Sequence, residues 1–283
     1  MDRRPLVSIV IPTYNSARTL GRTLESIARQ TYGNIEVIVV DKGSSDSTVD
    51  VARSFGARVL VVGASERSEQ KNVGAREARG DYLYFVDSDF ILEPGVVEEA
   101  VDKCEVEGYD AVLIHNTSDP TVSFWARVRK FERDFYMGDR LNVAVRFMRR
   151  DVFFSVGGFD EGLVAGEDYD LHNRIARAGY RIGEIRSREI HIGEPRSLLE
   201  VARKHFYYGK TIGRFIAKNG RRGVAQLSPV RPSYLKQWRR FFDDPLVTVG
   251  FIVYQAVRYS SALAGLLAGG LEAGARRLRG ANR

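Results

Sequence analysis

The fold of this 283-residue chain is decided by Tyr82-Leu-Tyr-Phe-Val-Asp-Ser-Asp89, an apolar run that ends in two carboxylates. Side chains typical of strands precede the first acid. Alternate side chains of an extended chain point the same way, so we expect Asp87 and Asp89 to reach toward one bound ion. Oxygen ligands in such small number suit Mg²⁺ or Mn²⁺, which are completed by water and substrate phosphates. Alternatively, Asp-Ser-Asp only caps a following helix.

Strand-like and helix-like segments alternate on both sides of this stretch. The runs typical of buried strands are 7–12, 35–40, 59–62 and 111–114, and helical spacing is found at 16–30, 47–55, 65–79 and 94–107. This alternation predicts an α/β fold with a doubly wound, mostly parallel, Rossmann-like sheet. Neither Gly-x-Gly-x-x-Gly after the first strand nor Gly-x-x-x-x-Gly-Lys-Ser/Thr occurs, so the standard dinucleotide and phosphate-loop sites are disfavoured.

Polar residues stand at the carboxyl ends of three predicted strands. Thr13, Asp41 and the pair Asp87 and Asp89 should therefore converge on one edge of the sheet, where open α/β sheets bind their ligands. We expect a nucleotide diphosphate at this edge. Asp41 has an alternative role in the turn that precedes Gly43.

The net charge of +7 is unevenly placed along the chain. From Ser197 onward there are 16 Lys and Arg against 4 Asp and Glu, and the preceding part has 27 against 32. A basic tail suits nucleic acid or an anionic membrane face. The N-terminus does not resemble a secretory signal, and the single cysteine, Cys104, excludes an internal disulfide and fits a reducing compartment.

Four short motifs lie in order between residues 5 and 192. They are Val7-Ser-Ile-Val-Ile-Pro-Thr-Tyr-Asn15, Glu36-Val-Ile-Val-Val-Asp41 with Gly43-Ser-Ser-Asp46, Asp87-Ser-Asp89, and Gly157-Gly-Phe-Asp160 followed by Gly166-Glu-Asp-Tyr-Asp-Leu171. In order and spacing this set resembles the family 2 glycosyltransferases of the GT-A fold. The resemblance implies an inverting hexosyltransferase that takes a sugar of the mannose or glucose type from a GDP- or UDP-linked donor.

The resemblance also implies roles for individual residues. The nucleotide-binding residues would be Pro12, Thr13, Tyr14, Asp41, Lys71, Asp87 and Ser88, with Thr13 and Asp41 at the base or ribose and Lys71 near the phosphates. Asp89 would bind Mn²⁺ or Mg²⁺ with Asp87 beside it, and His191 would be a late metal ligand, as in some GT-A enzymes. Asp168, next to Glu167, falls at the family's catalytic base.

Two positions depart from the family's pattern. The family often has Asp-Asp where this chain has Asp41-Lys42, and Phe90 stands where a third acid is frequent. Lys42 therefore changes the surroundings of the base. Phe90 leaves the metal with fewer protein carboxylates.

The expected chemistry needs these groups. A leaving nucleotide diphosphate accumulates negative charge, so a divalent cation that bridges it lowers the barrier. An acceptor hydroxyl must lose a proton, and a carboxylate such as Asp168 is the simplest base. An ionised phosphate acceptor would need no base. Glu167 and Asp168 would also favour the dipole of the helix that they begin, and a lone His191 is more often structural.

Residues 121–137 mix aromatic and basic side chains at spacings of three and four, which predicts an amphipathic helix. The segment lies between the metal and base motifs, where the resemblance implies acceptor binding. The alternatives are packing against the sheet and contact with lipid headgroups.

The tail divides into two further predicted regions after a GT-A domain at 1–195. Residues 196–243 are typical of amphipathic helices in a membrane interface, and 244–283 begin with an apolar segment interrupted by Arg258. As one helix, 246–271 would be about 39 Å long against a hydrocarbon core of roughly 30 Å. Arg258 near the bilayer centre would cost about 2.5 kcal/mol or more. Bases flank both ends of the segment, at 239–240 and 276–279, and placing both flanks on the cytoplasmic side favours a shallow hairpin over one crossing.

Gly265-x-x-x-Gly269 and Gly270-x-x-x-Gly274 suggest close helix contact and a homodimer through the apolar tail. A soluble helical subdomain is the alternative for the whole tail.

These features predict a membrane-associated glycosyltransferase at the cytoplasmic face. Its acceptor would be lipid-linked, as in glycan or N-glycan precursor assembly by a mannosyltransferase. The alternatives are a polyprenyl-phosphate sugar synthase with a phosphate acceptor, or a catalytically idle membrane scaffold. A nucleic-acid partner is disfavoured, because the basic residues of the tail accompany long apolar runs.

Overall fold

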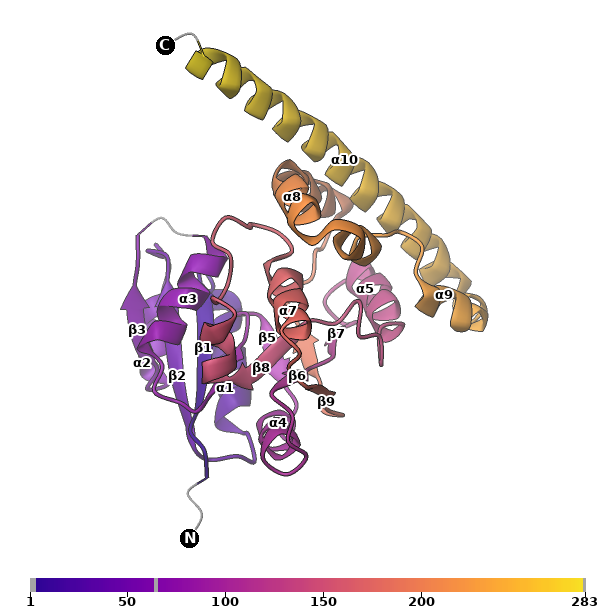
Figure 1. The fold of residues 1–283 in the computed structure, drawn as a ribbon. Helices are drawn as coiled ribbons and strands as arrows, with labels where there is room; N and C mark the ends of the chain where they lie inside the picture. Colours follow the sequence, from indigo (N-terminus) through magenta and orange to yellow (C-terminus); the bar gives the residue numbers. More distant parts are fainter. Residues whose placement is uncertain (1–3, 64–65, 282–283) are drawn as a thin grey trace. The chain divides into compact units, whose positions relative to one another are not determined.

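The computed structural model describes residues 4–63 and 66–281, and it describes side chains as far as residue 271. The chain divides into two compact units (Figure 1). The sheet unit comprises Met1–Ser118, Tyr136–Gly162 and Glu167–Gly193. The helical unit comprises Asp119–Phe135, Leu163–Gly166 and Glu194–Arg283.

A seven-stranded mixed sheet forms the centre of the sheet unit, in the order β3-β2-β1-β4-β8-β6-β9. The strands are β1 (Val7–Thr13), β2 (Ile35–Asp41), β3 (Arg58–Val61), β4 (Tyr82–Phe85), β6 (Ala111–Leu113), β8 (Val145–Arg149) and β9 (Ile182–Glu184). All neighbours are parallel except β8, which is antiparallel to both β4 and β6. The predicted mostly parallel α/β sheet is confirmed. The sequence did not predict β8, because Arg146 interrupts its apolar pattern.

Two layers of helices bury the sheet's apolar side chains. On one face, Ile9 of β1 shares a core with Leu24 of α1 (Ala17–Ala28) and Val101 of α4 (Val96–Glu105). Against the other face, α3 (Arg67–Glu77) packs so closely that a Cβ at Gly74 would lie 2.3 Å from a methyl carbon of Val10. The remaining helices of the unit are α2 (Thr48–Ser54), α6 (Arg150–Ser155) and α7 (Glu167–Arg177).

A second, three-stranded sheet joins distant parts of the sheet unit. It consists of β5 (Phe90–Leu92), β10 (Glu189–His191) and β7 (Asn116–Ser118), in the order β5-β10-β7. The antiparallel register pairs His191 with Phe90, and the amide of Ile192 donates to the carbonyl of Asp89 at 2.8 Å. This pairing brings His191 next to the acidic turn that follows β4.

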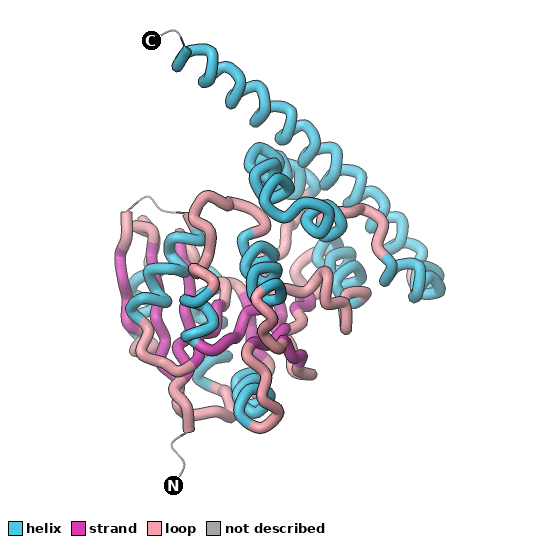
Figure 2. The backbone as a smooth tube through the Cα atoms, in the orientation of Figure 1, coloured by secondary structure: helices cyan, strands magenta, loops and turns pink. Residues whose placement is uncertain are grey.

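Helices and loops make up the described part of the helical unit (Figure 2). Its elements are α5 (Phe124–Asp134), α8 (Leu198–Gln226), α9 (Pro232–Lys236), the 3₁₀-helix η1 (Trp238–Phe242) and α10 (Pro245–Ala281). α5, which the sequence assigned to the 1–195 domain, is grouped with the tail helices.

The backbones of α8 and α10 pack closely at two glycines of α10, Gly265 and Gly269. A Cβ at Gly265 would lie 2.1 Å from the carbonyl oxygen of Phe206, and one at Gly269 would lie 2.4 Å from that of Lys210. The first of the two glycine motifs proposed for a homodimer therefore packs against α8 of the same chain, whereas nothing in the described part of the chain lies within 4 Å of a Cβ at Gly270 of the second motif.

The predicted hairpin at Arg258 is wrong, because α10 continues through this residue as one helix. The guanidinium of Arg258 finds a partner within the unit, with Nη1 2.8 Å from Oε1 of Glu132 on α5. By length and composition, Pro245–Leu271 is the one described helix that could cross a membrane.

Candidate active site

The turn after β2 is organised by Asp41, which is fully buried. One carboxylate oxygen accepts from the amides of Gly43 and Ser44 at 3.0 and 2.7 Å. The other accepts from the hydroxyls of Ser44 at 2.6 Å and Thr13 at 2.8 Å. Asp41 thus joins the ends of β1 and β2. Both carboxylate oxygens of Asp41 already accept hydrogen bonds from the protein. The contact of Asp41 and Thr13 with a base or ribose stays a prediction.

The residues next to this turn offer a more open surface. Tyr14 is 58% exposed, and the ammonium of Lys42 lies 5.7 Å from the centre of its ring. An exposed aromatic ring beside a cation can stack on a nucleobase. Pro12 is buried within β1, and the Ser88 hydroxyl donates to that of Ser16 at 2.9 Å, which ties the acidic turn to the start of α1.

Consecutive polar residues on α3 point into the protein, which explains why this helix lacks an apolar stripe. Gln70 donates to the carbonyls of Thr13 and Val40 at 2.9 and 2.7 Å. Asn72 donates to the carbonyl of Phe159 and accepts from its amide, both at 2.9 Å. These contacts fix the position of Lys71 between them.

Lys71 lies within 4 Å of three carboxylates, and only 1% of its side chain is exposed. Its ammonium nitrogen lies 2.9 Å from Oδ1 of Asp168, 3.7 Å from Oε1 of Glu167 and 3.8 Å from Oδ1 of Asp87. The ring of Phe159 lies 4.9 Å away on another side. One cation therefore connects the acidic turn after β4 with the start of α7.

Arg146 on β8 is a second buried cation at this site, and the sequence did not single it out. Its guanidinium lies 3.0 Å from Asp87 and 3.4 Å from Glu189, and it covers the ring of Phe90 at 4.8 Å. Glu189 is fully buried and accepts from the Tyr84 hydroxyl at 2.6 Å. A charged residue inside an apolar run, Val143-Ala-Val-Arg-Phe-Met148, was the available signal.

These contacts set the protonation of the acids. Burial acts to raise the pKa of Asp87, but Lys71 and Arg146 outweigh it and hold that pKa well below its ordinary value. The same balance lowers the pKa of Asp168. Burial dominates at Glu167 and Glu189, and the pKa of each carboxyl is raised.

Glu167 pairs most closely with Arg67, whereas Asp168 pairs with Lys71. The Glu167 side chain is 3% exposed, and Oε1 lies 2.9 Å from Nε of Arg67 at the start of α3. Asp168, by contrast, keeps 28% of its side chain exposed. Of the two acids, Asp168 is the one that a substrate can reach.

Asp89 and His191 form a separate pair, with Nε2 of His191 3.2 Å from Oδ2 of Asp89. Gly193 leaves the room that this carboxylate needs, because a Cβ there would lie 2.0 Å from Oδ2. The two acids thus have different partners in the structure, and their binding of one ion stays a prediction. β4 ends at Phe85, so Asp87 and Asp89 follow the strand instead of lying on it.

The metal prediction can be compared with this geometry. Among the side chains described, in residues 4–63 and 66–271, no three of His, Cys, Asp or Glu form a group that could hold a metal ion. Asp89 and His191 offer one oxygen and one nitrogen donor, whereas Asp87 faces Lys71 and Arg146. Such a pair fits an ion whose shell is completed by water and by substrate phosphates.

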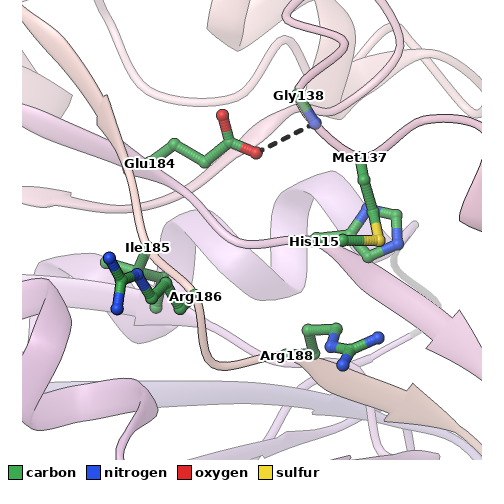
Figure 3. A pocket seen from close by; sticks show the side chains of 7 residues that line it. All are labelled: His115, Met137, Gly138, Glu184, Ile185, Arg186 and Arg188. Carbon is green, nitrogen blue, oxygen red and sulfur yellow. Dashed lines mark hydrogen bonds between the residues drawn. The ribbon is translucent and has the colours of Figure 1, made fainter.

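A pocket of about 500 Å³ lies elsewhere on the sheet unit (Figure 3). It is lined by His115, Met137, Gly138, Glu184, Ile185, Arg186 and Arg188. Strand directions put the ends of β6 and β9, which border it, on the same edge as the end of β4. None of the candidate acids lines this pocket, so we place the donor site at the Lys71 cluster, where the charges converge.

Comparisons with known proteins agree with the fold. The family described as Glycosyl transferase family 2 matches residues 8–180, which is more than half of the chain. Glycosyltransferase AglE of Haloferax volcanii is 28% identical over 194 residues, or 63% of this chain and 64% of its own. Glycosyltransferase GlyG of Streptococcus pneumoniae is 34% identical over 114 residues, 38% of each chain. The match spans less than two thirds of these relatives.

Solved structures give the same architecture at lower identity. Mannosyltransferase PcManGT from Pyrobaculum calidifontis, in complex with GDP-Man and Mn²⁺, has a TM-score of 0.57 at 20% identity, covering 99% of this chain and 81% of its own. TarS 1–349 of S. aureus in complex with UDP has a TM-score of 0.56 at 18% identity, covering 93% and 90%. At these identities, the likeness establishes the fold.

Proposed function

The chain belongs to glycosyl transferase family 2, and we propose that it transfers a sugar from a nucleotide diphosphate sugar to a hydroxyl acceptor. The observation that carries this proposal is the convergence of Lys71, Arg146, Asp87 and Asp168 at the carboxyl edge of the sheet. The Lys71 ammonium can form charge-assisted hydrogen bonds to a diphosphate as well as to these carboxylates.

Donor binding is assigned to three parts of the site. Lys71 would bind the diphosphate, the exposed Tyr14 and the neighbouring Lys42 would contact the base, and Asp89 with His191 would hold Mn²⁺ or Mg²⁺. When bound, the ion supplies positive charge beside the departing diphosphate. The structure of PcManGT with GDP-Man and Mn²⁺, and that of TarS with UDP, support this class of donor and ion.

Asp168 is the proposed general base. The acceptor oxygen forms a bond to the anomeric carbon while the bond from that carbon to the diphosphate oxygen breaks, and the acceptor's proton passes to the Asp168 carboxylate. Attack from the side opposite the leaving group inverts the anomeric carbon. Lys71 and Arg146 lower the pKa of Asp168, so it is ionised and ready to accept a proton at neutral pH.

The proposed acceptor is lipid-linked, at the cytoplasmic face of a membrane, and the sugar is of the mannose or glucose type. The support for this choice is the apolar helix Pro245–Leu271 together with the basic tail. A homodimer through the apolar tail would not use Gly265 and Gly269, because these glycines face α8 within the chain.

The test is transfer of radiolabel from GDP- or UDP-linked sugars into an organic-phase lipid acceptor with Mn²⁺. Asp168→Asn should lower transfer to a hydroxyl acceptor by about 100-fold or more. The matched control is Asp50→Asn, on the exposed side of α2, which should retain full transfer. If the acceptor is instead a polyprenyl phosphate, Asp168→Asn retains transfer. No transfer with any donor supports an idle scaffold.

A further inference from the structure

One side of α10 is an exposed, mainly apolar stripe in two groups of large side chains. Its large members are between 39 and 76% exposed: Leu246, Val249, Ile252, Val253, Leu263, Leu267 and Leu271. Within the groups 246–253 and 263–271 the spacings are one, three or four, and the exposed small residues Ala256 and Ser260 continue the same face across the gap between Val253 and Leu263. Leu246 and Leu271 lie about 38 Å apart along the axis. A stripe of this length exceeds the scattered apolar residues that ordinary soluble surfaces carry.

The opposite side of α10 is already used for packing. Phe251 lies 5.8 Å from Phe131 and 5.5 Å from Tyr234, measured between ring centres, and Tyr254 is 3% exposed. The ring of Phe251 packs α10 against α5 and against α9. Among the described side chains, α10 therefore has one face that packs within the helical unit and one face that is largely exposed.

Arg258 lies on the face that contacts protein. Its partner Glu132 is 1% exposed and also pairs with Arg129 of the same helix. Separating such a pair would leave a buried charge uncompensated, which is strongly destabilising. A single crossing would instead carry Arg258, Glu132 and the associated helices into hydrocarbon, where charged side chains are costly. The position of Arg258 favours a helix that keeps one side on the protein.

The surroundings of the stripe indicate what covers it. Close to the start of α10, the exposed apolar side chains Leu235, Trp238 and Phe242 alternate with the exposed bases Lys236 and Arg239. Aromatic and basic side chains together suit the headgroup region of an anionic bilayer. A second copy would bring an equally basic tail against this one, since each has 16 Lys and Arg against 4 Asp and Glu from Ser197 onward.

We propose that the α10 stripe, with Leu235, Trp238 and Phe242, is a docking surface for an anionic lipid bilayer, and that α10 lies in the plane of the interface. The choice of a membrane partner rests on the proposed function. The orientation of α10 and the residues that enter the bilayer go beyond it. The partner is recognised by burial of the stripe in the acyl boundary and by attraction of the flanking bases to lipid charge.

Flotation of the full chain with phosphatidylcholine vesicles, with and without phosphatidylglycerol, tests the surface. The wild type should float with the anionic vesicles, and Val249→Glu/Leu267→Glu should lower the partition coefficient about tenfold or more. Val61→Glu/Val106→Glu is the matched control, because these valines of the sheet unit are 61 and 79% exposed. Equal flotation of the stripe variant would overturn the proposal. So would a wild type that stays off vesicles and forms a dimer that the stripe variant disrupts.

The orientation is tested by nitroxide labels at Val249→Cys or Leu267→Cys on vesicle-bound protein. Cys104 is buried, and burial raises its pKa to about 12, so it needs no replacement. The two sites lie about 27 Å apart along the axis, so an in-plane helix gives them the same shallow depth by collisional relaxation. Clearly different depths would show a crossing helix and refute this orientation.

Calorimetric titration of GDP and UDP with Mn²⁺ and without vesicles separates the two proposals. A stripe variant that loses flotation but binds nucleotide like the wild type supports the docking surface. A wild type that binds nucleotide but never binds anionic vesicles refutes the docking surface alone. Vesicle binding without nucleotide binding refutes the transferase proposal alone.

Discussion

The ammonium of Lys71 and the carboxylate of Asp168 are 2.9 Å apart, and the same ammonium lies 3.8 Å from Asp87. One side chain thus joins the proposed base to the acidic turn after β4. A donor diphosphate that attracts Lys71 would weaken its hold on Asp168. Donor binding and the basicity of Asp168 are therefore expected to be linked.

Replacing Lys71 by Met should weaken the binding of GDP or UDP about tenfold or more, because a charge-assisted contact is lost. Titration calorimetry measures this effect. The control is Lys103→Met, on α4, whose ammonium lies 2.7 Å from Glu107. Equal nucleotide affinity in the two variants would contradict the role given to Lys71.

Substitutions of Arg146 and Glu189 should have coupled effects on the free energy of unfolding, because the two side chains form a buried ion pair. Arg146→Met leaves a fully buried carboxyl without its cation and should lower the free energy of unfolding by about 3 kcal/mol or more. Glu189→Gln keeps an acceptor for Tyr84, so the double variant should recover part of this loss. Urea denaturation of the four proteins measures the coupling. Strictly additive effects would argue against the buried pair.

Gly193 should be required for the Asp89 and His191 pair. Ala at this position places a Cβ 2.0 Å from Asp89 Oδ2, so the carboxylate must move. Gly193→Ala is expected to weaken Mn²⁺-dependent nucleotide binding about tenfold, since one proposed ligand is displaced. Gly33→Ala is the control, because nothing lies within 4 Å of a Cβ there. Normal Mn²⁺ dependence in Gly193→Ala would speak against this site.

His205 in the helical unit should make stability sensitive to pH. Burial, followed by the charge of Arg258, lowers its pKa from 6.5 to about 3. A group whose pKa is depressed in the folded state contributes stability above the unfolded value, and this stability is lost as the pH falls. The unfolding free energy should therefore decline between pH 6.5 and 3. His205→Gln should reduce that slope, and the comparison at pH 8 serves as control. Identical slopes would exclude His205 as the cause.

The sequence predicted the order of strands and helices through β6, except for the short β5, because local apolar patterns determine them. It also identified Asp87, Asp168 and Lys71, which the structure brings together. It did not identify Arg146 or Glu189, because their pairing depends on an antiparallel strand and on β10, whose partners lie far away in the sequence. The role of Arg258 was missed for the same reason. Its partner Glu132 is 126 residues earlier.

Metal-dependent nucleotide binding tests the central claim most directly. Titration of GDP and UDP into the wild type and into Asp89→Ala, each with Mn²⁺ or with EDTA, gives four affinities for each nucleotide. For the nucleotide of its donor, the wild type should bind about tenfold or more tightly with Mn²⁺ than with EDTA, and Asp89→Ala should lose this difference. Nucleotide affinity that is the same in all four conditions, or absent from the wild type, would contradict the proposed site.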